Sequence, residues 1–322
     1  MNRNQAIGVA IAIALACALP FVLGNYTTFQ LTMALCYAIA LMGLNMLTGY
    51  NGQISLGHGA FFAIGAYTAA ILMDKANWAY WATIPVAGLV CLVAGFLFGL
   101  PALRLEGLYL AVATLALGNA VPQILKHKGL EHWTGGSMGV VIIKPEAPEW
   151  TGLNQDQWLY YFTLLWVVLL FFAAWNILRG RVGRALVAIR DHPIAAQAMG
   201  INTAIYKSLT FGVSALYTGV AGALAAIAVQ FASPDSFTIF LSLTLLIGMV
   251  VGGLASISGA FYGALFIQFT PNIADQISKA APWAIYGVFL IGFMYLMPSG
   301  VAGLIRVVRH KVQVPLSRKE TR

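Results

Sequence analysis

Most of this chain consists of apolar stretches separated by short segments that carry its charges. A bilayer core about 30 Å thick requires roughly 20 apolar residues in each helix that crosses it. By that measure the sequence predicts ten crossings, several of them short or interrupted by glycine, at residues 5–24, 30–49, 56–73, 80–100, 106–125, 158–178, 208–229, 239–254, 258–270 and 283–305. Only 9% of the residues are charged, against about 25% in soluble domains. We therefore predict an all-α, polytopic membrane protein with a single membrane domain over residues 1–322.

The charges indicate which ends of these helices face the cytoplasm. Thirteen of the 18 basic residues, including those of a tail at 306–322, fall on the side that holds the N-terminus, together with three of the 10 acidic residues. The net charge is then +10 on that side and −2 on the other. Because loops rich in Lys and Arg stay in the cytoplasm, we expect both termini there. The overall net charge of +8 thus reflects orientation in membrane lipid and predicts no nucleic-acid partner.

One polar segment, residues 179–207, interrupts the apolar second half of the chain. Four arginines precede an Asp191-His192-Pro193 break, and apolar residues recur at helical spacing before it. Pro193 ends the first helix, and Gly200 is a typical end signal for a second one. The pattern predicts two short amphipathic helices joined at a bend. Two interpretations remain open: a connector that rests on the lipid surface, or a docking element that a soluble partner binds.

A second unusual segment, residues 44–67, places glycines among polar side chains inside the predicted membrane region. Its candidate functional residues are Asn45, Gln53, Ser55 and His58. Irregular backbone at membrane depth is tolerated only where protein or a water-filled path satisfies its polar groups. The segment is therefore either a broken helix beside a translocation path or a glycine-mediated helix contact with a polar loop at the inner surface. For His58, the pattern favours a structural role over a proton relay.

Two amides, Asn119 and Gln123, lie four residues apart on one face of the crossing predicted at 106–125. Amides inside a membrane span either form hydrogen bonds between helices or line a substrate path. The outer loop predicted at 126–157 contains two tryptophans, which are typical of a membrane–water interface.

Two pairs of glycines toward the C-terminus have the spacing of close helix contacts. Gly248 and Gly252 form one pair, and Gly259 and Gly263 form the other. Small residues four positions apart allow two helix backbones to approach closely in a membrane. The sequence therefore predicts tight helix packing in this region.

The sequence lacks several motifs that would give the chain chemistry of its own. It contains no HExxH zinc motif and no GxxxxGK[ST] phosphate-binding loop. Its three cysteines lie in apolar segments without CxxC spacing, which predicts neither a metal site nor disulfides. No paired carboxylates lie within the predicted crossings to couple transport to protons or sodium. We therefore predict a chain that is not an enzyme, binds no cofactor, and takes the energy for any transport from another chain.

Four runs of this sequence together resemble the LivM branch of membrane permeases in the branched-chain amino-acid ABC importer family. They are residues 44–67, the run beginning GLYLAVATLALG at 107–125, residues 181–202, and residues 233–263. With their spacing they cover about residues 30–265. The resemblance implies a multi-pass permease of the bacterial inner membrane, in an ATP-driven importer of branched-chain or related amino acids.

The resemblance also implies partners and functional residues. A second, LivH-like permease, two cytoplasmic ATPases that bind ATP and Mg²⁺, and a periplasmic substrate-binding protein would complete the transporter. Residues 181–202 would be the equivalent of the EAA loop and fit a groove on an ATPase. The residues implied in this coupling are Arg184, Arg190, Asp191, Pro193, Ala195, Ala196 and Gly200. The candidates for the translocation path are Asn45, Gln53, Ser55, His58, Asn119 and Gln123.

The chain departs from the family pattern at two positions. Family members usually have an acidic residue before the Ala-Ala step, where this chain has Pro193, and commonly have Glu at the position of Asn119. The first difference puts in doubt a specific salt bridge to the ATPase. The second is explained either by a different ligand or by a local repacking. Urea, amides and aromatic acids are the alternative substrates. A self-sufficient secondary transporter or channel, and a purely structural membrane subunit, are the alternative functions.

Overall fold

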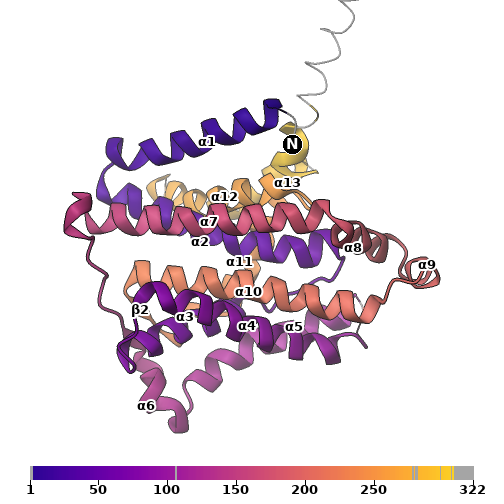
Figure 1. Cartoon of the computed structure of the whole chain (residues 1–322), viewed down its shortest axis with the longest axis horizontal. Coiled ribbons are helices and arrows are strands. Elements are labelled where there is room, and N and C mark those ends of the chain that lie inside the picture. The colour runs from indigo at the N-terminus through magenta and orange to yellow at the C-terminus, as the bar shows by residue number, and fades with distance from the viewer. Residues whose placement is uncertain are drawn as a thin grey trace, which may run out of the picture.

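The computed structural model describes residues 3–105, 107–277, 279, 282–297, 299–305 and 307, and these residues are almost entirely helical (Figure 1). A helix lies in each of the ten ranges expected to cross the membrane. These helices are α1 (Arg3–Val22), α2 (Asn25–Leu44), α3 (His58–Asp74), α4 (Tyr80–Ala102), α5 (Leu108–Leu125), α7 (Gln155–Arg179), α10 (Thr203–Val229), α11 (Ile239–Gly252), α12 (Ile257–Ile277) and α13 (Pro282–Leu296). Five described helices are long and apolar enough to cross a membrane. They are α2 together with the helical residues that follow it as far as Tyr50, α4, α5, α7 and α10. The predicted tail at 306–322 lies outside the described residues except for residue 307.

Helices α2 and α10 are the most deeply buried of these five. α10 packs against α2, α3 and α4, and glycines make the close contacts possible. A Cβ atom on Gly65 of α3 would overlap the backbone of Gly219 of α10, and one on Gly222 would overlap the carbonyl group of Phe62. Because lipid tails are as apolar as the side chains, helices in a membrane associate through such packing rather than through the hydrophobic effect.

Helices α11 and α12 contact each other through the two predicted glycine pairs. Gly248 lies against the carbonyl group of Gly263, and Gly252 lies against that of Gly259. Each glycine of one helix therefore faces a glycine of the other. A Cβ atom at Gly252, Gly259 or Gly263 would overlap the facing backbone, whereas one at Gly248 would first meet the side chains of Ile267 and Leu41. The prediction of tight helix packing here is confirmed.

The second half of α1 is held by tyrosines of α7. Pro20 has no N–H group, so the carbonyl of Ala16, four residues earlier, has no partner within the helix. The Tyr160 hydroxyl donates to that carbonyl at 2.9 Å, and the Tyr161 hydroxyl donates to the carbonyl of Cys17 at 2.6 Å. Neighbouring side chains thus satisfy the backbone group that a proline leaves unpaired inside a membrane helix.

The two ends of the bundle differ in construction. At the left in Figure 1, the connections include α6 (Glu131–Thr134) and the antiparallel strands β1 (Val140–Val141) and β2 (Phe231–Ala232). An ion pair between Lys126 and Asp235 joins two of these connections. The opposite end holds the first described residue of α1 and the connection between α7 and α10.

Candidate functional site

Helix α2 continues beyond its regular part as a π-helical segment, Asn45–Tyr50. Such segments are rare and occur frequently at functional sites. The side chain of Asn45 binds the connection between α11 and α12: its Nδ2 donates to the carbonyl of Ser256 at 2.7 Å, and its Oδ1 accepts from the N–H of Ala255 at 2.8 Å. Gly49 packs directly against Asn45 and Ala255, and a side chain there would overlap both. The end of α2 is therefore fastened to the α11–α12 connection.

His58, the first residue of α3, makes two hydrogen bonds in the buried interior. Its Nε2 lies 2.7 Å from Oγ of Ser214, and its Nδ1 lies 3.0 Å from Oγ of Ser55. Because Ser214 donates its own proton to the carbonyl of Gly43 at 2.6 Å, Nε2 of His58 must donate and Nδ1 must accept. A neutral imidazole satisfies both contacts. This geometry supports the structural interpretation of His58, which links α2, α3 and α10.

The loop between Tyr50 and His58 and the first turn of α3 are held by hydroxyl groups from other helices. The N–H of Leu56 donates to Oγ1 of Thr114 on α5 at 2.9 Å, and the N–H of Gly59 donates to Oγ of Ser242 on α11 at 2.9 Å. Protein therefore satisfies much of this irregular backbone, as membrane depth requires.

Sequence reasoning missed Ser214, Thr114 and Ser242, since a single hydroxyl residue in an apolar helix forms no pattern. The signal that could have found them is a set of Ser and Thr residues on helices rich in small side chains, where a hydroxyl can reach a neighbouring backbone.

The candidate path residues lie in two separate places. Asn45, Ser55 and His58 are each 1% exposed, and Gln53 is 7% exposed, so this group is buried inside the bundle. Asn119 and Gln123 are instead exposed on α5. Within the described part of the chain, neither of these amides has a hydrogen-bond partner.

The connection between α7 and α10 contains two short helices, α8 (Arg181–Asp191) and α9 (Pro193–Ala198), as the sequence predicts. α8 buries Ala185, Leu186 and Ile189 against the bundle and exposes Arg181 and Arg184. Pro193 is the first residue of α9, where its missing N–H costs nothing. α8 and α9 protrude at the right of Figure 1.

Most of the residues implied in coupling are exposed, on these two helices or, for Gly200, in the turn that follows α9. They are Arg184, Arg190, Asp191, Pro193, Ala195 and Gly200. Ala196 is different: it is only 4% exposed, so its methyl group packs inside the chain. Two large apolar residues that sequence reasoning did not single out, Ile194 and Met199, are 82% and 84% exposed beside it.

Arg190 connects the α8–α9 pair to the interrupted helix. Its Nη1 donates to the carbonyl of Gly49 at 2.8 Å, while its Nε donates to the carboxylate of Asp191 at 2.9 Å. Gly52 has φ of +75°, and a Cβ atom there would lie 2.8 Å from Cγ of Arg190. The stem of Arg190 therefore crosses the loop that follows α2 where that loop has no side chain.

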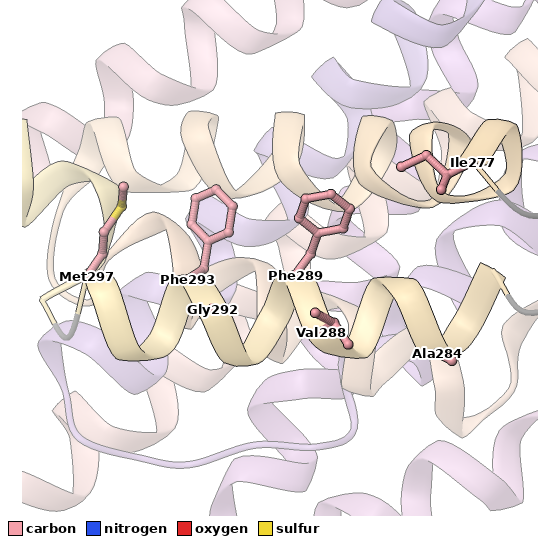
Figure 2. A pocket seen from close by; sticks show the side chains of 7 residues that line it. All are labelled: Ile277, Ala284, Val288, Phe289, Gly292, Phe293 and Met297. Atoms are coloured by element: carbon pink, nitrogen blue, oxygen red, sulfur yellow. The ribbon is translucent and has the colours of Figure 1, made fainter.

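A groove of about 570 Å³ lies beside α13 (Figure 2). Phe289, Phe293 and Met297 point from the α13 side toward the helix that carries Ile277. Its lining is completed by Ala284, Val288 and Gly292. An amino acid needs polar groups to orient its ammonium and carboxylate, and these residues provide none. This groove is therefore not a candidate substrate site.

The helical bundle, with five described helices long and apolar enough to cross a membrane, is that of a polytopic membrane protein. Residues 26–298 match the family described as "Branched-chain amino acid transport system / permease component", and the chain belongs to that family. It is therefore a non-catalytic, multi-pass subunit of a bacterial ABC importer in the inner membrane. It binds no cofactor itself, because ATP hydrolysis belongs to separate subunits.

Individual relatives agree with this assignment. The chain is 32% identical to the high-affinity branched-chain amino acid transport permease LivM of Escherichia coli, over 94% of this chain and 76% of the relative. It is 24% identical to LivH of the same organism, over 84% of this chain and 92% of the relative. The galactofuranose transporter permease YtfT of Escherichia coli is 27% identical over 71% of this chain and 67% of its own length. No solved structure matches the chain.

Proposed function

We propose that this chain moves branched-chain or related amino acids into the cytoplasm after a periplasmic binding protein delivers them. The main support for this proposal is the α8–α9 pair. The pair is exposed on one face, and Arg190 joins it by a hydrogen bond to the buried interruption of α2. A membrane subunit without its own energy source requires a rigid element through which a partner can bias two conformations. Residues 1–322 would form one permease domain with ten crossings and both termini in the cytoplasm.

The exposed surface of α9 supports docking of a soluble ATPase. Ile194 and Met199 are almost fully exposed on a helix pair at the end of the bundle that carries the arginines. Exposed apolar residues within a polar surface are typical of a protein contact. Ala195 and Gly200 add small side chains, which allow a close approach. With a LivH-like permease as second membrane subunit, the transporter would contain two ATPases, and the binding protein would dock on the opposite side.

The exposed stripe of α5 supports a contact with the second permease and with the substrate path. Tyr109, Val112, Asn119 and Gln123 follow one face of this helix and are all exposed. An amide without a partner is costly in lipid, so a face that carries two of them is better explained by protein or water than by acyl chains. In an importer made of two related permeases, the space between the two permeases can offer these amides both protein and water.

Reconstituted uptake tests this proposal. The chain, a second permease, the ATPases and the binding protein from the same organism are placed in vesicles, and accumulation of labelled leucine, isoleucine and valine is measured. We expect uptake that requires both ATP and the binding protein. Uptake driven by a proton gradient without ATP would identify a secondary transporter. ATP-dependent uptake of urea, an aromatic acid or galactofuranose, with no amino-acid uptake, would contradict the substrate class.

A further inference from the structure

We infer that Arg190 is a positioning residue that transmits movement of α8 to the interrupted end of α2 and onward to the α11–α12 connection. The inference rests on the proposed function, since it assumes that an ATPase moves the α8–α9 pair. It assigns Arg190 a role different from docking: the side chain acts on the permease and not on the ATPase.

The hydrogen bond between Arg190 and Gly49 has a clear physical basis. The last carbonyl groups of a helix have no partners within it, and they carry the negative end of the helix dipole. Gly49 lies one residue before the end of the Asn45–Tyr50 segment, and its carbonyl accepts from the guanidinium at 2.8 Å. A cation from α8 thus caps the C-terminal end of the interrupted helix. The two elements are joined by charge as well as by contact.

Glycines allow α8 and the α11–α12 connection to approach the end of α2 closely. A Cβ atom on Gly52 would lie 2.8 Å from Cγ of Arg190, and one on Gly49 would overlap Asn45 and the backbone of Ala255. The arginine stem and the α11–α12 connection therefore approach the same short segment from different helices. A displacement of α8 that preserves these contacts must displace the segment too.

Asn45 extends the connection to a third element. Its Nδ2 and Oδ1 hold the carbonyl of Ser256 and the N–H of Ala255, and its side chain is buried. The order of contacts is Arg190, Gly49, Asn45 and then the turn between α11 and α12. Coupling between separated sites requires contiguous packed and hydrogen-bonded groups of this kind, whose two arrangements both sites bias.

The test compares three variants in the purified, reconstituted transporter. Arg190→Met keeps an unbranched stem but removes the donor, whereas Arg190→Lys keeps a positive donor. Arg181→Met, in the first turn of the same helix, is the matched control because Arg181 is exposed and does not take part in the Gly49 contact. ATPase copurification, ATP hydrolysis and leucine uptake are measured for each. We expect Arg190→Met to assemble and hydrolyse ATP while its uptake per ATP falls about tenfold, within the range of typical coupling energies. Arg190→Lys should recover most of that loss.

A second measurement does not depend on the substrate. Spin labels at Val182 and Leu254, both exposed, report the distance between α8 and the α11–α12 connection. That distance distribution should change with ATP in the parent complex and change less in Arg190→Met. An unaltered uptake ratio in Arg190→Met, or an equal ATP response with and without the arginine, would overturn the inference. Loss of ATPase copurification in Arg190→Met would also overturn it, because Arg190 would then be a docking residue. Failure of the parent complex to take up amino acids while the ATP response persists would instead count against the proposed function alone.

Discussion

The Nη1 atom of Arg190 lies 2.8 Å from the carbonyl oxygen of Gly49, 141 residues earlier in the chain, and donates to it. This hydrogen bond joins an exposed helix pair to a buried interruption of α2. The exposed pair is the docking element that we propose for the ATPase, and the interruption is where α2, α3, α10 and the α11–α12 connection meet. The contact therefore links the exposed α8–α9 pair at this end of the bundle to the polar groups buried inside the bundle.

The first prediction concerns topology. In a chain whose native cysteines are replaced by alanine, Ala195→Cys should react with a membrane-impermeant maleimide only after the cells are opened. Glu131→Cys should react in cells with an opened outer membrane, because the charge bias places α6 outside. Both positions are exposed in this chain, and the permease is expressed without its ATPases so that the proposed docking contact does not cover Ala195. Labelling of both positions from the same side would contradict the ten-crossing arrangement.

A second prediction concerns glycine packing in the core. Gly219→Val should destabilise the protein, because a Cβ atom there would overlap the thiol of Cys91 on α4. Overpacking of this kind costs about 1–3 kcal/mol. The measurement is the midpoint of thermal unfolding in detergent. Gly292→Val in α13 is the control, since no atom lies within 4 Å of a Cβ at that position. Equal midpoints for the two variants would show that the α4–α10 contact is looser than described.

The proline in α1 allows a double-mutant test. Tyr160→Phe removes the hydrogen bond to the carbonyl of Ala16 and should cost about 0.5–1.5 kcal/mol of unfolding free energy. Pro20→Ala restores an N–H that can bond to the same carbonyl, so the cost of Tyr160→Phe should shrink in that background. Additive effects of the two substitutions would mean that the tyrosine does not replace the missing helix bond.

The amides of α5 provide a fourth prediction. If Asn119 and Gln123 border the substrate path, Asn119→Leu should reduce uptake severalfold while the second permease still copurifies. If they form hydrogen bonds between the two permeases, the loss should be about 1 kcal/mol of association and copurification should fall. Ala120→Leu, on the same exposed face, is the control for added bulk. Normal uptake and assembly in Asn119→Leu would show that this residue neither borders the substrate path nor forms a hydrogen bond to the second permease.

The docking surface can be tested at Ala195. Ala195→Trp should strain a close contact by about 1–3 kcal/mol and weaken ATPase binding roughly tenfold or more. Leu97→Trp is a suitable control for added bulk, because Leu97 is 58% exposed and lies on α4, outside the α8–α9 pair. Copurification of the ATPase is the measurement. A connector that merely rests on lipid would accept the tryptophan without loss.

The sequence determined the class of this protein and the positions of its main helices. A bilayer fixes the length of an apolar helix, and every backbone polar group inside it must be paired, so apolar runs translate directly into helices. Individual residues also predicted local features of the structure. Pro193 separates α8 from α9, and the glycine pairs of α11 and α12 face each other at the predicted spacing.

Only the tertiary structure decided which residues act together. Periodicity shows that one side of α8 and α9 is apolar, but it does not reveal that Ala196 turns inward or that Arg190 reaches Gly49. The hydrogen bonds of His58 to Ser214 and of Asn45 to Ser256 join residues 156 and 211 positions apart. Such pairs leave no local pattern, because a buried polar group is satisfied by whatever the packing of distant helices brings within about 3 Å.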